Sequence, residues 1–211
     1  MALKTLVKIS NVTNLSDARY CAGMGVDMLG FSMDTDSLEY VDPKKFGEIR
    51  GWVAGVQIVG ETSSSDTDEI EQLLETYQPD ILQVDEAALL PYLSTLSPST
   101  ERLPLILRVD LMQVTLDQLD TLFQTGATGA DYVLLESNGA LYLDGDWKDA
   151  LQRLSNRYPI LLGTGISAKN VHDLLSDLPV QGIALSGGSE ERPGNKEFGE
   201  LMDILEAIEE E

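Results

Sequence analysis

The stretch Ile160–Glu190, ILLGTGISAKNVHDLLSDLPVQGIALSGGSE, contains two short apolar runs, and each run ends in a glycine-rich turn. Ile160–Gly163 and Gly182–Leu185 have the continuous apolar character of buried parallel strands. Ser167–Leu178, between them, has the three- and four-residue spacing of a helix. Two parallel strands need such a crossover helix, so this unit predicts an α/β fold.

The same alternation of short apolar runs and helical segments covers the rest of the chain. The other expected strands are Leu6–Ser10, Met28–Ser32, Gly55–Val59, Ile81–Val84, Leu105–Val109 and Tyr132–Leu135. A helix is expected to begin at Leu15, with Asn14 or Thr13 as its cap, and to end at Gly23 and Gly25. Another is expected to begin at Pro43, and a short one follows Val84. The remaining expected helices are Asp66–Tyr77, Thr115–Thr125, Trp147–Tyr158 and Glu197–Ile208. This pattern predicts a single-domain (β/α)8 TIM barrel over residues 1–211, with an open doubly wound sheet as the alternative.

The composition, 43% hydrophobic and 24% charged residues, is that of a globular protein. The chain has 36 acidic and 14 basic residues, a net charge of −22, which disfavours nucleic acid and anionic membranes as partners. Cys21 is the only cysteine, so an intrachain disulfide and a multi-cysteine zinc site are excluded. We expect a cytoplasmic protein without a signal peptide or a membrane span, acting as a monomer or a homodimer.

Glycines after the last two expected strands indicate a phosphate site. Gly163, Thr164 and Gly165 follow one strand, and Ser186, Gly187 and Gly188 follow the next. Backbone N–H groups at such turns bind anions, and barrels often hold phosphate at these two loops. We therefore expect a phosphorylated small molecule as the ligand.

Several short motifs in this order resemble the phosphoribosylanthranilate isomerase family of tryptophan biosynthesis. They are VKISNVTN at 7–14, GVDMLGF at 25–31, DILQV at 80–84, DW at 146–147, GTGI at 163–166, SGGSE at 186–190 and PGNK at 193–196. The resemblance implies a cofactor-free Amadori rearrangement, an aldose-to-ketose isomerisation. In that reaction an acid protonates the ribose ring oxygen, a base removes the C2 proton, and the resulting enolamine collapses to an aminoketose phosphate.

The resemblance also shows where this chain departs from the family pattern. Ser10 stands where the family has its cysteine base, and Glu136 where it has its aspartic acid. Glu39 stands where the family has an arginine that holds the anthranilate carboxylate. Ala184 replaces an aspartate near the sugar, and Asp85 replaces a histidine. The pattern of a phosphate site is kept, and the rest of the site is changed.

The candidate catalytic residues follow from these matches. Glu136 is expected to be the acid, and Ser10 or a nearby carboxylate such as Asp110 the base, because an unassisted serine hydroxyl is too weakly acidic. Lys8 is the cation of the first strand, and it is expected to neutralise a bound phosphate, to pair with Glu136, or to form a structural ion pair. No metal ligand is assigned.

Acidic residues follow many of the expected strands. They are Asp34, Asp36, Glu39, Asp85, Glu86, Asp110 and Glu136. A barrel mouth lined by them should reject a carboxylate and favour a neutral or cationic group on the substrate, although such acids can also simply face solvent. The alternative functions are an inactive paralogue that binds a phosphorylated metabolite and a protein that binds a divalent cation at this mouth.

Overall fold

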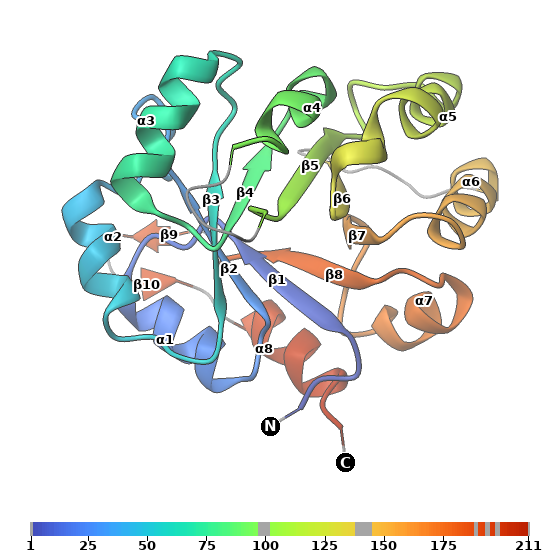
Figure 1. Ribbon diagram of the computed structural model, residues 1–211. Helices are drawn as coiled ribbons and strands as arrows, with labels where there is room; N and C mark the ends of the chain where they lie inside the picture. Colours follow the sequence, from blue (N-terminus) through green and yellow to red (C-terminus); the bar gives the residue numbers. More distant parts are fainter. Residues whose placement is uncertain are drawn as a thin grey trace.

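The computed structural model (Figure 1) describes residues 2–96, 102–137, 145–187, 190–192, 195–196 and 199–210. Parallel strands β1 to β8 close into a barrel in chain order, and β8 pairs with β1. The strands are β1 Leu6–Ser10, β2 Met28–Ser32, β3 Gln57–Glu61, β4 Ile81–Val84, β5 Leu105–Asp110, β6 Tyr132–Glu136, β7 Ile160–Gly163 and β8 Gly182–Ser186. The predicted (β/α)8 barrel is confirmed, and the open sheet is excluded.

The helices lie outside the barrel, and both chain ends lie near β1 and α8 (Figure 1). They are α1 Leu15–Gly23, α2 Pro43–Arg50, α3 Thr67–Tyr77, α4 Leu90–Leu93, α5 Leu116–Thr125, α6 Gly145–Ser155, α7 Val171–Asp177 and α8 Gly199–Ala207, with short 3-10 turns Ala87–Leu89 and Ala127–Gly129. Among the described residues, no helix is both long and apolar enough to cross a membrane.

Side-chain caps define where several helices begin. The Asn14 side chain accepts a hydrogen bond from the Asp17 N–H at 2.9 Å and caps α1. Asp42 caps α2, whose first residue is Pro43. Thr115 caps α5 in a capping box with Gln118. These residues satisfy N–H groups that have no partner inside the helix, so they fix the residue at which each helix begins.

Several predicted boundaries were wrong. The helix expected at Trp147–Tyr158 is α6 Gly145–Ser155 and ends three residues earlier. The third strand was expected at Gly55–Val59, but Gly55 has φ +76° and belongs to a turn, so β3 begins two residues later. The helix expected from Ser167 begins at Val171, because the Asn170 side chain accepts from the Ser167 N–H and holds this segment as a turn. A hairpin of β9 Glu190–Arg192 and β10 Asn195–Lys196 was not predicted.

The barrel interior changes from apolar to polar along the strands. A buried cluster of Met28, Val59, Ile81, Ile106, Leu134, Leu161 and Ala184 fills the middle of the interior. Because side chains alternate along a strand, the residue two positions later on each strand points inwards again, closer to the carboxyl ends. On β3 to β6 those residues are Glu61, Gln83, Arg108 and Glu136. Polar side chains therefore gather at the end of the barrel where barrel enzymes bind their ligands.

Candidate active site

The strand register brings distant residues together at the carboxyl end of the barrel. Glu61 is opposite Ser32 on one side and Gln83 on the other. Glu136 is opposite Asp110 and Gly163. Two hollows open at this end of the barrel, one over β1–β6 and one over β7 and β8.

The first hollow, called here the acidic hollow, has a volume of about 320 Å³. It is lined by the carboxylates of Asp34, Asp36, Glu61, Asp85 and Glu136. Arg108 is the cation that lines it, and the remaining lining residues are uncharged: Ser10, Asn11, Ser32, Ser37, Thr62, Ser63 and Gln83. The lining is therefore strongly acidic.

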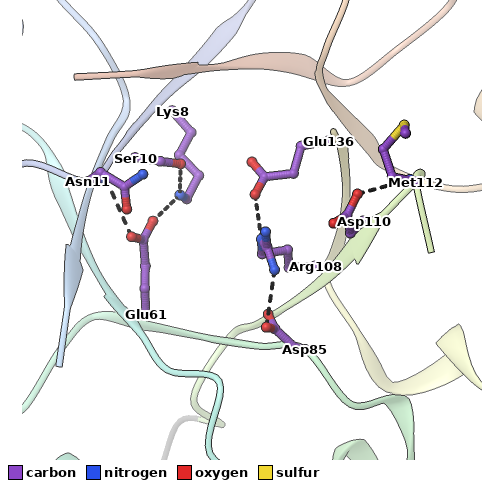
Figure 2. Close-up of polar contacts among 9 residues, drawn as sticks. All are labelled: Lys8, Ser10, Asn11, Glu61, Asp85, Arg108, Asp110, Met112 and Glu136. Atoms are coloured by element: carbon purple, nitrogen blue, oxygen red, sulfur yellow. Dashed lines mark hydrogen bonds and ion pairs between the residues drawn. The ribbon is translucent and has the colours of Figure 1, made fainter. Parts of the chain in front are cut away.

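A buried ion pair lies at the β1–β3 side of this hollow (Figure 2). The Lys8 ammonium, which is 0% exposed, pairs with the Glu61 carboxylate and donates to Ser10 Oγ at 2.6 Å. The Asn11 backbone N–H donates to Glu61 Oε2 at 3.4 Å. The side chain of Ser10 is thus held in contact with a cation that Glu61 neutralises from β3, on the far side of β2.

Gly30 on β2 provides the space for this ion pair. A Cβ atom at this position would lie 2.0 Å from Glu61 Oε1 and 3.0 Å from Lys8 Nζ. Any larger residue would push the carboxylate away from the ammonium. The glycine therefore allows a charged pair to sit inside the barrel wall.

A second ionic group lies across the hollow (Figure 2). The Arg108 guanidinium donates through Nε to Glu136 Oε1 and through Nη1 to Asp85 Oδ2, the latter at 3.1 Å. Burial lowers the pKa of Arg108, but the hydrogen bond to Glu136 and the charges of Glu136, Asp85 and Asp110 outweigh it and raise the pKa overall. Burial raises the pKa of Asp85, against the opposing effect of Arg108. Arg108 therefore stays charged and bonded to carboxylates of the same hollow.

The end of β7 is shaped around Glu136. A Cβ atom on Gly163 would lie 2.9 Å from the Glu136 Cβ and 3.4 Å from its Oε2. Glu136 can extend over β7 because Gly163 has no side chain. This close approach connects the acidic hollow with the second one.

The second hollow, called here the glycine hollow, has a volume of about 580 Å³. Its lining includes Gly163, Thr164 and Gly165 after β7, Ser186 and Gly187 after β8, and Ile204 from α8. Gly165 has φ +72°, a conformation that favours glycine. Glu39 and Glu200 also line this hollow, and both are exposed to solvent. Asn11 lines both hollows and marks where they meet.

The expected site residues fall into different positions. Ser10, Asp85 and Glu136 line the acidic hollow, whereas Glu39, Gly163, Thr164, Gly165, Ser186 and Gly187 line the glycine hollow. Asp110 is not among the described residues that line either hollow, and its Oδ1 accepts the Met112 N–H at 2.9 Å. Lys8 forms the structural ion pair that was one of its expected roles, but its partner is Glu61 and not Glu136.

The glycine turn after β8 differs from the expected cradle. The Gly187 N–H donates to the Ser10 carbonyl at 2.9 Å, so this amide ties β8 to β1 and is already used. Gly188 lies outside the described residues. The backbone around Thr164 and Gly165 is therefore the better candidate for binding an anion.

Sequence reasoning missed Glu61, Gln83 and Arg108. Glu61 was lost because the third strand was placed two residues too early. Arg108 carried a readable signal, since it is a lone cation inside the apolar run LILRVD, as Lys8 is inside LVKIS. Among the described residues, no group of three or more His, Cys, Asp or Glu is arranged to hold a metal ion.

Comparisons with known proteins agree with this fold and identify a family. The family model for N-(5'phosphoribosyl)anthranilate (PRA) isomerase matches residues 7–207. An N-(5'-phosphoribosyl)anthranilate isomerase of Nitrobacter winogradskyi is 26% identical over 217 residues, covering 97% of this chain and 93% of that protein.

Solved structures show the same fold at lower identity. Phosphoribosyl anthranilate isomerase of Thermotoga maritima superposes with a TM-score of 0.77 at 20% identity, covering 97% of this chain and 98% of that one. A phosphoribosyl anthranilate isomerase in complex with reduced 1-(o-carboxyphenylamino)-1-deoxyribulose 5-phosphate superposes with a TM-score of 0.73 at 19% identity, with the same coverage.

Proposed function

The chain belongs to the N-(5'-phosphoribosyl)anthranilate isomerase family, and from this premise we propose that it isomerises an N-(5-phosphoribosyl) amine to the corresponding 1-amino-1-deoxyribulose 5-phosphate. The observation that carries the proposal is the pairing of Glu136 with Arg108 in a hollow that adjoins the glycine hollow. In this arrangement a sugar phosphate binds with its phosphate at the glycine hollow and its ribose over Asn11.

Glu136 is the proposed acid. Its carboxyl group protonates the ribose ring oxygen, the C1–O bond breaks, and the nitrogen lone pair forms an iminium at C1. Arg108 holds the carboxyl group in position through Nε. Glutamate is longer than the family's aspartate by one methylene group, and the space left by Gly163 accommodates that length.

Glu61 is the proposed base. A serine hydroxyl is a poor base, and Ser10 Oγ already accepts a hydrogen bond from the Lys8 ammonium. The Glu61 carboxylate lines the same hollow, and its Oε2 has only the long contact to Asn11 in the part of the chain described. It takes the proton from C2 of the iminium, the C1–C2 enolamine forms, and this tautomerises to the ketose. We prefer it to Asp110, which is not among the described residues that line this hollow and whose Oδ1 accepts the Met112 N–H.

The experiment follows the conversion by ¹H and ¹³C NMR, with the aldose prepared from ribose 5-phosphate and aniline. The protein should convert the anomeric signals into those of a C2 ketone faster than the buffer control does. Glu136→Gln should lose about 10²- to 10⁴-fold in rate and still bind ribose 5-phosphate. Glu75→Gln, an equal charge change on the exposed face of α3, should have no effect. Equal rates for Glu136→Gln and the wild type would contradict the assignment.

A second pair of variants separates the two candidate bases. Glu61→Gln should slow conversion at least 100-fold, whereas Ser10→Ala should stay within about tenfold of the wild type. The opposite order would move the base to Ser10. Binding of ribose 5-phosphate without conversion in the wild type would favour the alternative of a protein that only binds phosphorylated metabolites.

A further inference from the structure

The cations at the acidic hollow are already bonded to carboxylates of this chain. Arg108 donates to Glu136 and Asp85, and Lys8 pairs with Glu61. The hollow's carboxyl groups are Asp34, Asp36, Glu61, Asp85 and Glu136, and with Glu136 protonated as the proposed acid the other four still exceed these two cations by two charges. A ligand carboxylate entering here would be repelled unless it displaced one of the internal ion pairs.

Hydrogen-bond donors at the rim of the hollow are also already bonded to a carboxylate of this chain. Asp34 accepts from the Thr62 hydroxyl at 2.5 Å, from the Ser63 N–H at 2.7 Å and from the Ser63 hydroxyl at 2.8 Å. These donors would otherwise suit a bound anion. The chain's own carboxylate occupies them instead.

Gln83 is a buried acceptor that lacks a donor. Its side chain lines the hollow and is 5% exposed, and its Oε1 has no hydrogen-bond partner among the described residues. A buried carbonyl oxygen that has no hydrogen bond destabilises the folded protein. A ligand that brings an N–H group to this oxygen removes that destabilisation, which a carboxylate cannot do.

We propose that the acidic hollow binds a hydrogen-bond-donating, protonated nitrogen group on the amine substituent of the substrate, and that Gln83 and Asp36 determine this specificity. The inference rests on the proposed function, because the sugar phosphate in the glycine hollow directs the substituent past Asn11 into the acidic hollow. The substrate class is then an N-(5-phosphoribosyl) amine with an amino or amidino group. An ortho-carboxylate is selected against.

The test is a set of three stable analogues measured by titration calorimetry at pH 7. They are reduced 1-arylamino-1-deoxyribulose 5-phosphates that carry an ortho aminomethyl, carboxamide or carboxylate group. We expect the aminomethyl compound to bind at least tenfold more tightly than the carboxylate, with the carboxamide between them. Equal or tighter binding of the carboxylate, or no binding of any analogue, would overturn the inference.

Variants locate the effect in the hollow. Asp36→Asn should reduce the preference for the aminomethyl compound several-fold, whereas Asp68→Asn, the same charge change on the exposed first turn of α3, should leave the preference unchanged. Gln83→Met keeps the size of the side chain and should weaken the aminomethyl and carboxamide compounds without changing the affinity for ribose 5-phosphate. If Asp36→Asn and Asp68→Asn changed the preference equally, the preference would not arise in the acidic hollow, and the inference would be wrong.

Binding of the analogues and conversion of the aldoses test this inference and the proposed function separately. The expected order of affinities without conversion of any aldose would support this inference and contradict the isomerase. Conversion of the carboxylate-bearing aldose at a rate equal to or above that of the aminomethyl compound would support the isomerase and overturn this inference.

Discussion

The two hollows at the carboxyl end of the barrel are built in different ways. The acidic hollow is made of charged side chains that pair with one another, such as Lys8 with Glu61 and Arg108 with Glu136. The glycine hollow is made largely of backbone, around Gly163 and Gly165, with apolar side chains from β8 and α8 behind it. One region depends on side-chain chemistry, and the other depends on main-chain conformation.

This difference predicts which part of the site changes more easily through substitution. A site made of backbone keeps its N–H groups whatever the side chains are, provided that the turn stays the same. A site made of paired charges can change its specificity through a few side-chain substitutions, at positions such as Ser10 and Glu136. We therefore expect the turn of the glycine hollow to tolerate side-chain substitutions better than the paired charges of the acidic hollow do.

The largest effect on stability is expected from breaking the buried ion pair of the acidic hollow. Lys8→Met leaves Glu61 as an unpaired buried carboxylate and should lower the free energy of unfolding by about 3–5 kcal/mol, measured by urea denaturation. Replacing both partners, Lys8→Met with Glu61→Leu, should recover most of the loss, because no buried charge is left. A single variant as stable as the wild type would show that the pair is not structural.

A smaller effect is expected from closing the space in β2. Gly30→Ala places a Cβ atom 2.0 Å from Glu61 Oε1 and should lower stability by about 1–3 kcal/mol through overpacking and separation of the ion pair. Gly47→Ala in α2, where no atom lies within 4 Å of the new Cβ, is the matched control and should stabilise by about 0.5–1 kcal/mol. Thermal and urea unfolding of both variants would distinguish the two results.

The glycine hollow should respond through its backbone. Gly165 has φ +72°, so Gly165→Ala should cost about 1–2 kcal/mol of stability and weaken binding of ribose 5-phosphate. Calorimetry with ribose 5-phosphate measures the second effect. Unchanged affinity in a folded variant would show that this turn does not bind the phosphate. The glycine hollow would then not depend on backbone conformation in the way that distinguishes it from the acidic hollow.

The smallest expected effect is a pH dependence in the acidic hollow. Burial raises the pKa of Asp85 in the folded protein, so the folded state holds this proton more tightly than the unfolded state does. The contribution of Asp85 to stability therefore falls as the pH rises from the ordinary aspartate value of about 3.9 through the raised value. The stability gained by Asp85→Asn should grow across that window and stay level above it. A gain that grew towards lower pH would have the wrong sign.

The fold could be predicted from the sequence because it depends on local patterns. Most strand and helix segments were found, since apolar runs, spacing and caps such as Asn14 are properties of neighbouring residues. The third strand was placed two residues too early because Gly55 directly precedes an apolar run. Its positive φ, which places it in a turn, cannot be read from the sequence. The glycine turns after β7 and β8 were also readable, because glycine marks such turns in the sequence, but the hydrogen bond from the Gly187 N–H to the Ser10 carbonyl was not.

The pairing of charges was decided only by the tertiary structure. Lys8 and Glu61 are 53 residues apart, and Arg108 is 23 residues from Asp85 and 28 from Glu136. The sequence determined that these groups are present and that they lie near strand ends. Which carboxylate meets which cation depends on the register and closure of the barrel, because an ion pair is fixed by distances of a few ångströms across strands. For the same reason only the structure could show that Gln83 has an unsatisfied oxygen and that the cations of the acidic hollow are already bonded to the chain's own carboxylates.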